Sequence, residues 1–143
     1  PQESMTYVSR TANGLTTYHV ATDTVFANDD RTGARTTSYA YDWYADSQQA
    51  YSVTTTMPTV STAQNGSGVA ATSTVAFDTD GRVVWSKDAG GFLTYNQYDQ
   101  ATGSLLKTIA DVEAQARKTG RLDFGSGGPA SIGHIYGELM KKT

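Results

Sequence analysis

The sequence predicts an all-β fold built from antiparallel hairpins. Only 17% of the 143 residues are charged, whereas Tyr (9), Gly (14) and runs of Thr and Ser are frequent. β-Branched and aromatic residues favour strands. Between residues 72 and 109, short apolar-polar segments alternate with Gly-containing turns at intervals of about ten residues, the pattern of an antiparallel meander. We therefore expect residues 1–110 to form one β domain.

The N-terminal segment predicts a tight hairpin. Met5 to Ala12 and Leu15 to Ala21 flank Asn13-Gly14. This dipeptide favours a type I′ turn, because both of its residues accept a positive φ. We expect a further short strand from Val25 to Arg31, running into a loop.

Two more strands are predicted before residue 59. Thr37, Tyr39 and Tyr41 share one face by period two, which indicates a strand. A second strand is expected from Ser47 to Thr56, and Pro58 ends it because proline has no backbone donor for a ladder.

Residues 59–71 are small, uncharged and rich in Gly and Ser, which predicts a flexible loop or insertion. Four strands should then follow one another, with turns at DTDG, DAGG and QATG. Their expected ranges are Thr72 to Phe77, Arg82 to Lys87, Phe92 to Tyr98 and Leu105 to Ile109.

The meander pattern stops after Ile109. Residues 111–128 predict a short helix, capped by Asp111 and ended by Gly120, and then a Gly-rich linker. Residues 129–143 predict a short amphipathic helix, which needs a protein surface to dock on because it is too short to be stable alone. GSGG before such a peptide also resembles an engineered tag, an alternative that the sequence leaves open. The apolar residues of this tail are candidate partner contacts: Ile132, Ile135, Tyr136, Leu139 and Met140.

Composition argues against several classes of function. The net charge is -3 and the pI is near 5.2, with no basic cluster before the final two lysines, so neither nucleic acid nor an anionic membrane is an expected partner. No apolar run is long enough to predict a membrane span. The absence of cysteine excludes disulfides and a cysteine nucleophile. Because the chain begins with Pro1 rather than Met, we expect a processed product or an excised segment.

No residue is expected to be catalytic or to bind a metal. Asp78 and Asp80 could offer oxygens to calcium, but Gly81 comes too early for an EF-hand loop and Ala89 occupies the position of its final Glu. Asp-x-x-Gly is typical of tight turns instead. The two histidines have no nearby Ser-Asp arrangement, so we expect a protein that is not an enzyme and has no cofactor.

Trp43, Tyr44 and Trp85 are the remaining candidate binding residues. Exposed aromatic rings on a sheet can stack on sugars or on a partner protein. The alternative is that they pack within the repeat.

A repeat links several of these segments. Phe77-Asp78 lies 21 residues before Tyr98-Asp99 (98 − 77 = 21). The stretch from Asp88-Ala89-Gly90-Gly91 through Tyr98-Asp99 also matches the stretch from Asp30 through Tyr41-Asp42, with one residue of slack. Over roughly residues 28 to 109 this pattern, and the phrase GARTTSYAYD above all, resembles the RHS/YD-repeat family.

The resemblance implies YD-repeat hairpins that coil into a curved or spiral sheet in a large secreted or cell-surface protein. This chain holds only two or three units and no DPxGW-like core motif. We therefore expect a structural segment of a filament, stalk or repeat shell, joined through strand edges to other copies of itself or to further YD repeats. The alternatives are a shell fragment of a polymorphic-toxin delivery protein and a carbohydrate-binding adhesin.

Overall fold

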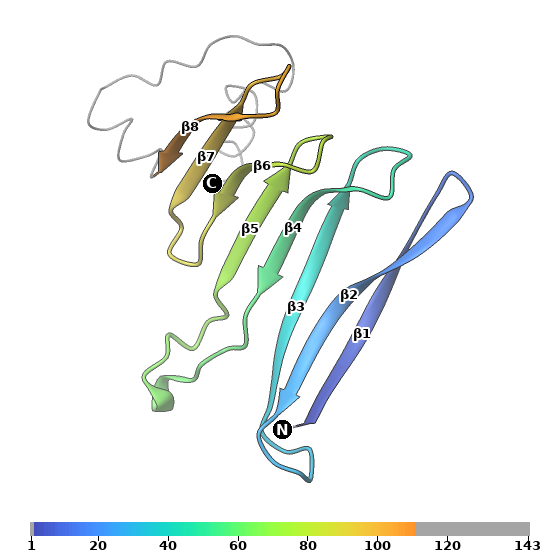
Figure 1. Cartoon of the computed structure of the whole chain (residues 1–143). Helices are drawn as coiled ribbons and strands as arrows, with labels where there is room; N and C mark the ends of the chain where they lie inside the picture. Colours follow the sequence, from blue (N-terminus) through green and yellow to red (C-terminus); the bar gives the residue numbers. More distant parts are fainter. Residues whose placement is uncertain (1, 111–143) are drawn as a thin grey trace. The chain divides into compact units, whose positions relative to one another are not determined.

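The computed structural model describes residues 2–110, and the helices expected within 111–143 lie outside the described residues. The described chain is all-β, with eight strands in one antiparallel sheet and each strand beside its sequence neighbour (Figure 1). The sheet does not close, because β1 and β8 do not pair with each other. The strands are β1 (Gln2–Ala12), β2 (Leu15–Phe26), β3 (Ala34–Trp43), β4 (Ala50–Thr56), β5 (Thr72–Phe77), β6 (Val83–Lys87), β7 (Leu93–Tyr98) and β8 (Leu105–Ala110).

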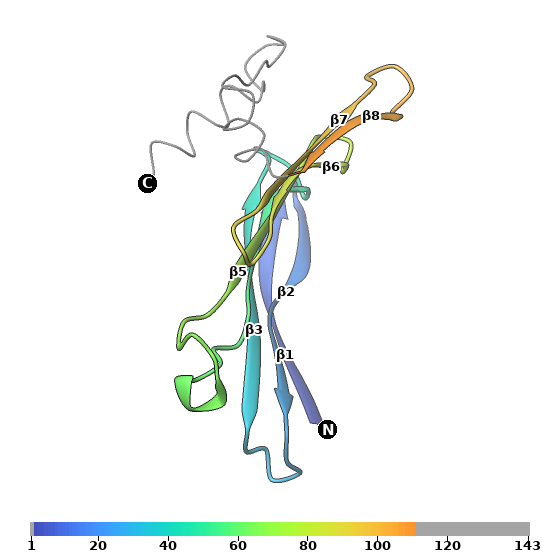
Figure 2. The ribbon, with the colours of Figure 1, turned by 90° about the vertical axis from the view of Figure 1, so that its left-hand side faces the viewer.

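The sheet of residues 2–110 is a single layer. A view turned by 90° shows the strands one behind another, with no second sheet packed on them (Figure 2). Ala12 and Ala76 are the buried apolar residues among those described, and Ser52 is the buried polar one. Since so little apolar surface leaves water, hydrogen bonds between strands must supply much of the order.

The predicted N-terminal hairpin is confirmed. Asn13 and Gly14 have φ values of 50° and 75° between β1 and β2. The separate strand expected from Val25 is wrong, because Val25 continues β2 and pairs with Glu3 on one side and Arg35 on the other. β2 runs to Phe26, past the end at Ala21 that its sequence pattern predicts. A loop begins after Phe26.

The segment between β4 and β5 is an exposed loop with a defined backbone path. It is closed by a hydrogen bond from the Met57 amide to the Ala71 carbonyl at 2.8 Å, and it contains a 3-10 turn, η1 (Thr62–Gln64). Gly66 is needed where the chain folds back, because a Cβ there would lie 2.1 Å from the Val60 carbonyl oxygen.

The β5–β6 turn has the Asp-x-x-Gly geometry predicted for it. The Asp78 Oδ1 accepts hydrogen bonds from the backbone amides of Asp80 (3.0 Å) and Arg82 (2.9 Å), and its Oδ2 accepts one from the Arg82 guanidinium at 2.7 Å. Gly81 takes a φ of 78°, which favours glycine. Both carboxylate oxygens of Asp78 are therefore engaged within the turn.

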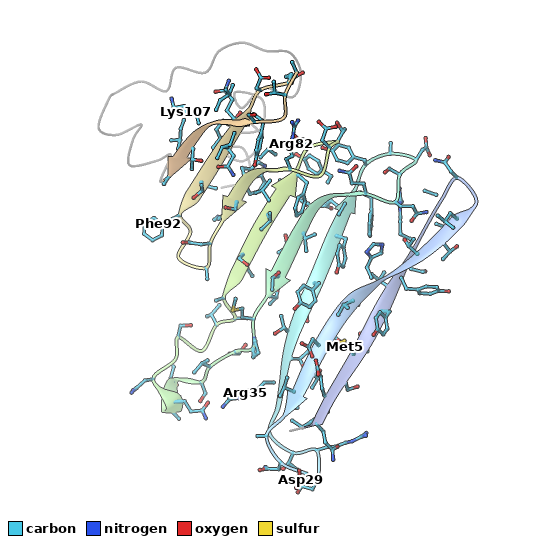
Figure 3. The ribbon with its side chains drawn as sticks, viewed as in Figure 1. Met5, Asp29, Arg35, Arg82, Phe92 and Lys107 are labelled. Atoms are coloured by element: carbon cyan, nitrogen blue, oxygen red, sulfur yellow. The ribbon has the colours of Figure 1, made fainter. Side chains whose placement is uncertain are left out.

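The β6–β7 turn repeats this arrangement at the other end of the strands. Asp88 Oδ1 accepts hydrogen bonds from the amides of Gly90 and Phe92, both at 2.9 Å. Gly91 takes a φ of 88°. Figure 3 places Arg82 and Phe92 at opposite ends of this part of the sheet. The same Asp-x-x-Gly pattern therefore reverses the chain at both ends of β6.

The 21-residue spacing in the sequence coincides with equivalent local structure. The strand register shifts between Ala76 and Phe77 in the β5–β6 ladder, and it shifts again between Gln97 and Tyr98 in the β7–β8 ladder. In each case the aromatic residue follows the shift and an aspartate opens the next turn. The repeat therefore places a β-bulge and a turn at matching positions.

Asp78 and Asp99, which open the β5–β6 and β7–β8 turns, favour the charged form. Burial acts to raise the pKa of Asp78, but hydrogen bonds from Arg82 and the Asp80 amide outweigh it and leave the pKa below its ordinary value. Side-chain and backbone hydrogen bonds from Thr102 likewise lower the pKa of Asp99. A carboxylate with a lowered pKa stabilises the fold above its unfolded-state pKa, and this contribution disappears as pH falls through the lowered value.

We therefore expect the urea midpoint of unfolding to be nearly constant around neutral pH and to fall between about pH 4 and pH 2. The double variant Asp78→Asn/Asp99→Asn should have a lower midpoint at pH 7 and a shallower loss in acid. Asp29→Asn, at an exposed residue outside these turns, is the control. An acid loss as steep in the double variant as in the parent would contradict this assignment.

Candidate functional site: interaction surfaces

The loop of residues 44–49, here called the clamp loop, joins β3 to β4 and binds the β1–β2 hairpin. The Arg10 guanidinium donates from Nε to the Ser47 carbonyl at 3.0 Å and from Nη2 to the Tyr44 carbonyl at 3.1 Å. In the opposite direction, the Gln48 side-chain amide donates to the carbonyls of Ala12 (3.1 Å) and Leu15 (2.6 Å). These bonds hold the hairpin tip against the centre of the sheet.

The same loop also binds the β5–β6 hairpin. The Tyr44 hydroxyl donates to the Phe77 carbonyl at 2.7 Å, and the Gln49 side-chain amide donates to the Asp78 carbonyl at 2.7 Å. Burial, followed by the nearby charge of Asp78, raises the pKa of Tyr44, so its hydroxyl stays protonated as a donor. The clamp loop therefore connects three successive hairpins that share little apolar contact.

Trp43 lies in an aromatic cluster beside the clamp loop. Its ring stacks on that of Tyr41, with centroids 5.3 Å apart and planes at 19°, and the His19 ring meets it edge-on at 4.6 Å. The Arg10 guanidinium carbon lies 5.6 Å from the Trp43 centroid, close enough for a cation–π interaction. These contacts account for Trp43 by packing, and a role in ligand binding stays a prediction.

Trp85 lies on the other face of the sheet. Asp42, Ser52, Ala76 and Trp85 are successive direct partners across β3 to β6, and directly paired residues share a face. Tyr41, next to Asp42 in β3, points to the opposite face. The structure therefore does not bring Trp85 together with the Trp43 cluster.

The indole N–H of Trp85 is buried and has no acceptor among the described residues. The third aromatic candidate, Tyr44, packs edge-on against Tyr51 with centroids 5.4 Å apart. The tail candidates lie outside the described residues: Ile132, Ile135, Tyr136, Leu139 and Met140.

A row of hydroxyl side chains crosses the Trp85 face, and no pattern in the sequence predicts which hydroxyls meet there. Three cross-strand pairs are hydrogen-bonded through their hydroxyls, at 2.6, 2.9 and 3.1 Å. These pairs are Thr6–Thr22, Thr24–Thr36 and Thr54–Thr74. Alternating threonines in neighbouring strands were the available signal, but which threonines meet depends on the register, which the sequence does not specify.

The outer edge of β1 is a further exposed feature. Met5, Tyr7 and Val8 are 43%, 58% and 40% exposed along it. Within residues 2–110, β1 pairs only with β2, and β8 pairs only with β7. Figure 3 labels Met5 on this border of the sheet. Both ends of the described sheet therefore carry backbone groups available to a further strand.

Residues 2–110 contain no helix that could cross a membrane and no group of three or more His, Asp or Glu side chains suited to holding a metal ion. Comparison of the chain with protein-family models, curated proteins and solved structures finds no match.

If the clamp loop secures the sheet, Tyr44→Phe should lower the free energy of unfolding by about 1–2 kcal/mol, because the Phe77 carbonyl loses a donor while the ring is retained. Urea denaturation measures this change. Tyr18→Phe is the matched control, since Tyr18 is 71% exposed. Equal stability of the two variants would show that the Tyr44 bond contributes nothing.

Proposed function

We propose that this chain is a structural and interaction segment of an extracellular or cell-surface assembly, joined to its neighbours through β-strand edges. The observation that carries the proposal is the open single-layer sheet, in which both outer strands of residues 2–110 lack a second partner. A strand edge is a row of unpaired N–H and C=O groups, and proteins either protect such an edge or use it for binding.

The distribution of apolar side chains supports the same proposal. Large apolar residues are exposed on β1, β2, β8 and the β4–β5 loop, whereas only two alanines are buried among the described apolar residues. Extended exposed apolar surface usually marks a place where another protein binds. A chain that buries so little alone is stabilised by neighbours, as the units of a repeat protein are.

The resemblance to YD repeats gives the proposal its biological setting. Two turn-and-strand units 21 residues apart carry equivalent bulges and aspartate turns, which is the behaviour expected of units that add to a growing sheet. In that family the hairpins coil into a curved or spiral sheet in secreted or surface proteins. Further repeats or further copies would continue the sheet at β1 and β8.

A shell fragment of a toxin-delivery protein is the second candidate, because an open sheet with two free ends also suits one arc of a larger wall. The two candidates differ in what accompanies the repeats. A variable effector domain downstream in the parent protein would favour the shell, and its absence would favour a filament or stalk.

Light scattering over a concentration series, with electron microscopy of any large species, tests the assembly. We expect the weight-average mass to rise with concentration. The double edge variant Val8→Lys/Leu106→Lys should remain monomeric, because lysine on an edge opposes strand addition. Val69→Lys, at a residue of the β4–β5 loop that is 72% exposed, should assemble like the parent. A parent chain that stays monomeric at every concentration would refute the proposal.

A further inference from the structure

We propose that β1 pairs with β1 of a second copy, antiparallel and across a two-fold axis, so that two sheets continue into one. This inference rests on the proposed function, since it names the edge and the partner that the assembly uses.

The outer edge of β1 lacks the features that normally protect an edge. The strand has 11 residues, against 6 in β8, and it contains neither proline nor lysine. Its central segment, Ser4 to Ser9, reads SMTYVS; it is uncharged and each of its residues is exposed. Six-residue segments of high β-propensity and low charge, without proline, are prone to pair with identical segments. β8, in contrast, carries Lys107 in its middle.

The bulge in this hairpin leaves β1 regular. Thr6 pairs with Thr22 and Tyr7 pairs with Val20, so the additional residue, Ala21, belongs to β2. Bulges commonly protect an edge by bending the strand that carries the extra residue. Here that residue lies on the inner strand, and β1 keeps an uninterrupted row of outward backbone groups.

The charges of β1 favour the antiparallel arrangement. Glu3 is near one end of the strand and Arg10 near the other. Antiparallel pairing about the middle of the strand keeps the two Glu3 residues about 20 Å apart, at 3.4 Å per residue, while each Arg10 guanidinium is held by its own clamp loop. Parallel pairing would place like charges side by side and gives the less stable ladder.

Symmetry limits the register. Residues directly opposite each other share a face, so a two-fold pair must be centred on a residue, with partners at equal distances on either side. Centring on Thr6 places Met5 opposite Tyr7 of the second copy, twice. A methionine sulfur beside an aromatic ring is a favourable contact. We therefore assign the two-fold axis to Thr6.

Disulfide trapping tests the β1–β1 pairing. The chain has no cysteine of its own, so only the introduced cysteines can form a disulfide. Opposed Cα atoms in an antiparallel pair lie about 4.5–5.5 Å apart, within the range that a disulfide spans. Thr6→Cys should form a disulfide-linked dimer under mild oxidation, visible on a non-reducing gel. Met5→Cys alone should not, because its equivalent on the second copy would lie two residues further along the strand, at about 7–8 Å. The pair Met5→Cys/Tyr7→Cys should cross-link.

Two controls make the outcome specific. Leu106→Cys on β8 and Val69→Cys in the β4–β5 loop should stay monomeric on the gel. When association is measured without cross-linking, Val8→Lys should raise the dissociation constant of the dimer about tenfold. The strand signal in circular dichroism should not change.

The joint and the proposed function can fail separately. Scattering that shows assembly, together with no Thr6→Cys dimer, would overturn the β1–β1 joint while leaving the assembly intact. Cross-linking that appears only when Thr6→Cys is mixed with Leu106→Cys would also overturn it, in favour of head-to-tail addition. A parent chain that is monomeric at every concentration would overturn both.

Discussion

The fold of residues 2–110 depends on hydrogen bonding, because one layer of sheet cannot enclose an apolar core. Each strand is held by its neighbours, and the clamp loop adds side-chain bonds between successive hairpins. Gln48 and Gln49 are suited to this task. Their side-chain amides reach backbone carbonyls in the two flanking hairpins.

The repeated turn explains how such a sheet grows. An aspartate that accepts bonds from amides two and four residues ahead, with a glycine at positive φ, reverses the chain in a few residues at Asp78 and again at Asp88. Apart from the β4–β5 loop the connections are short, and each strand lies beside the previous one, so that the order along the sheet equals the order in the sequence. The result is a structure that can be extended at either end without altering what is already formed, and this property connects the fold to the proposed role.

Local features were predictable from the sequence, and long-range ones were not. Asn13-Gly14 and the Asp-x-x-Gly turns specify their own backbone conformation, so the hairpins they close could be placed correctly. The roles of Arg10 and Gln48 depend on contacts 33 to 37 residues away, and no local pattern encodes them. The sequence pattern predicts a separate strand from Val25 because β2 is long and irregular, and only its pairing with Glu3 and Arg35 reveals the continuity. The aromatic candidates were found by residue type, but their division between two faces depends on the strand register.

The central claim is that this chain forms a hydrogen-bonded sheet with an open edge at β1. Amide hydrogen exchange, resolved by residue and measured at low and high protein concentration, tests this claim most directly. The account predicts slow exchange in β3, β4 and β5 at both concentrations. In β1, alternate amides should exchange quickly when the chain is dilute and become protected when it is concentrated. Protection of every β1 amide in the dilute chain would show that the edge is already covered, and it would contradict the account.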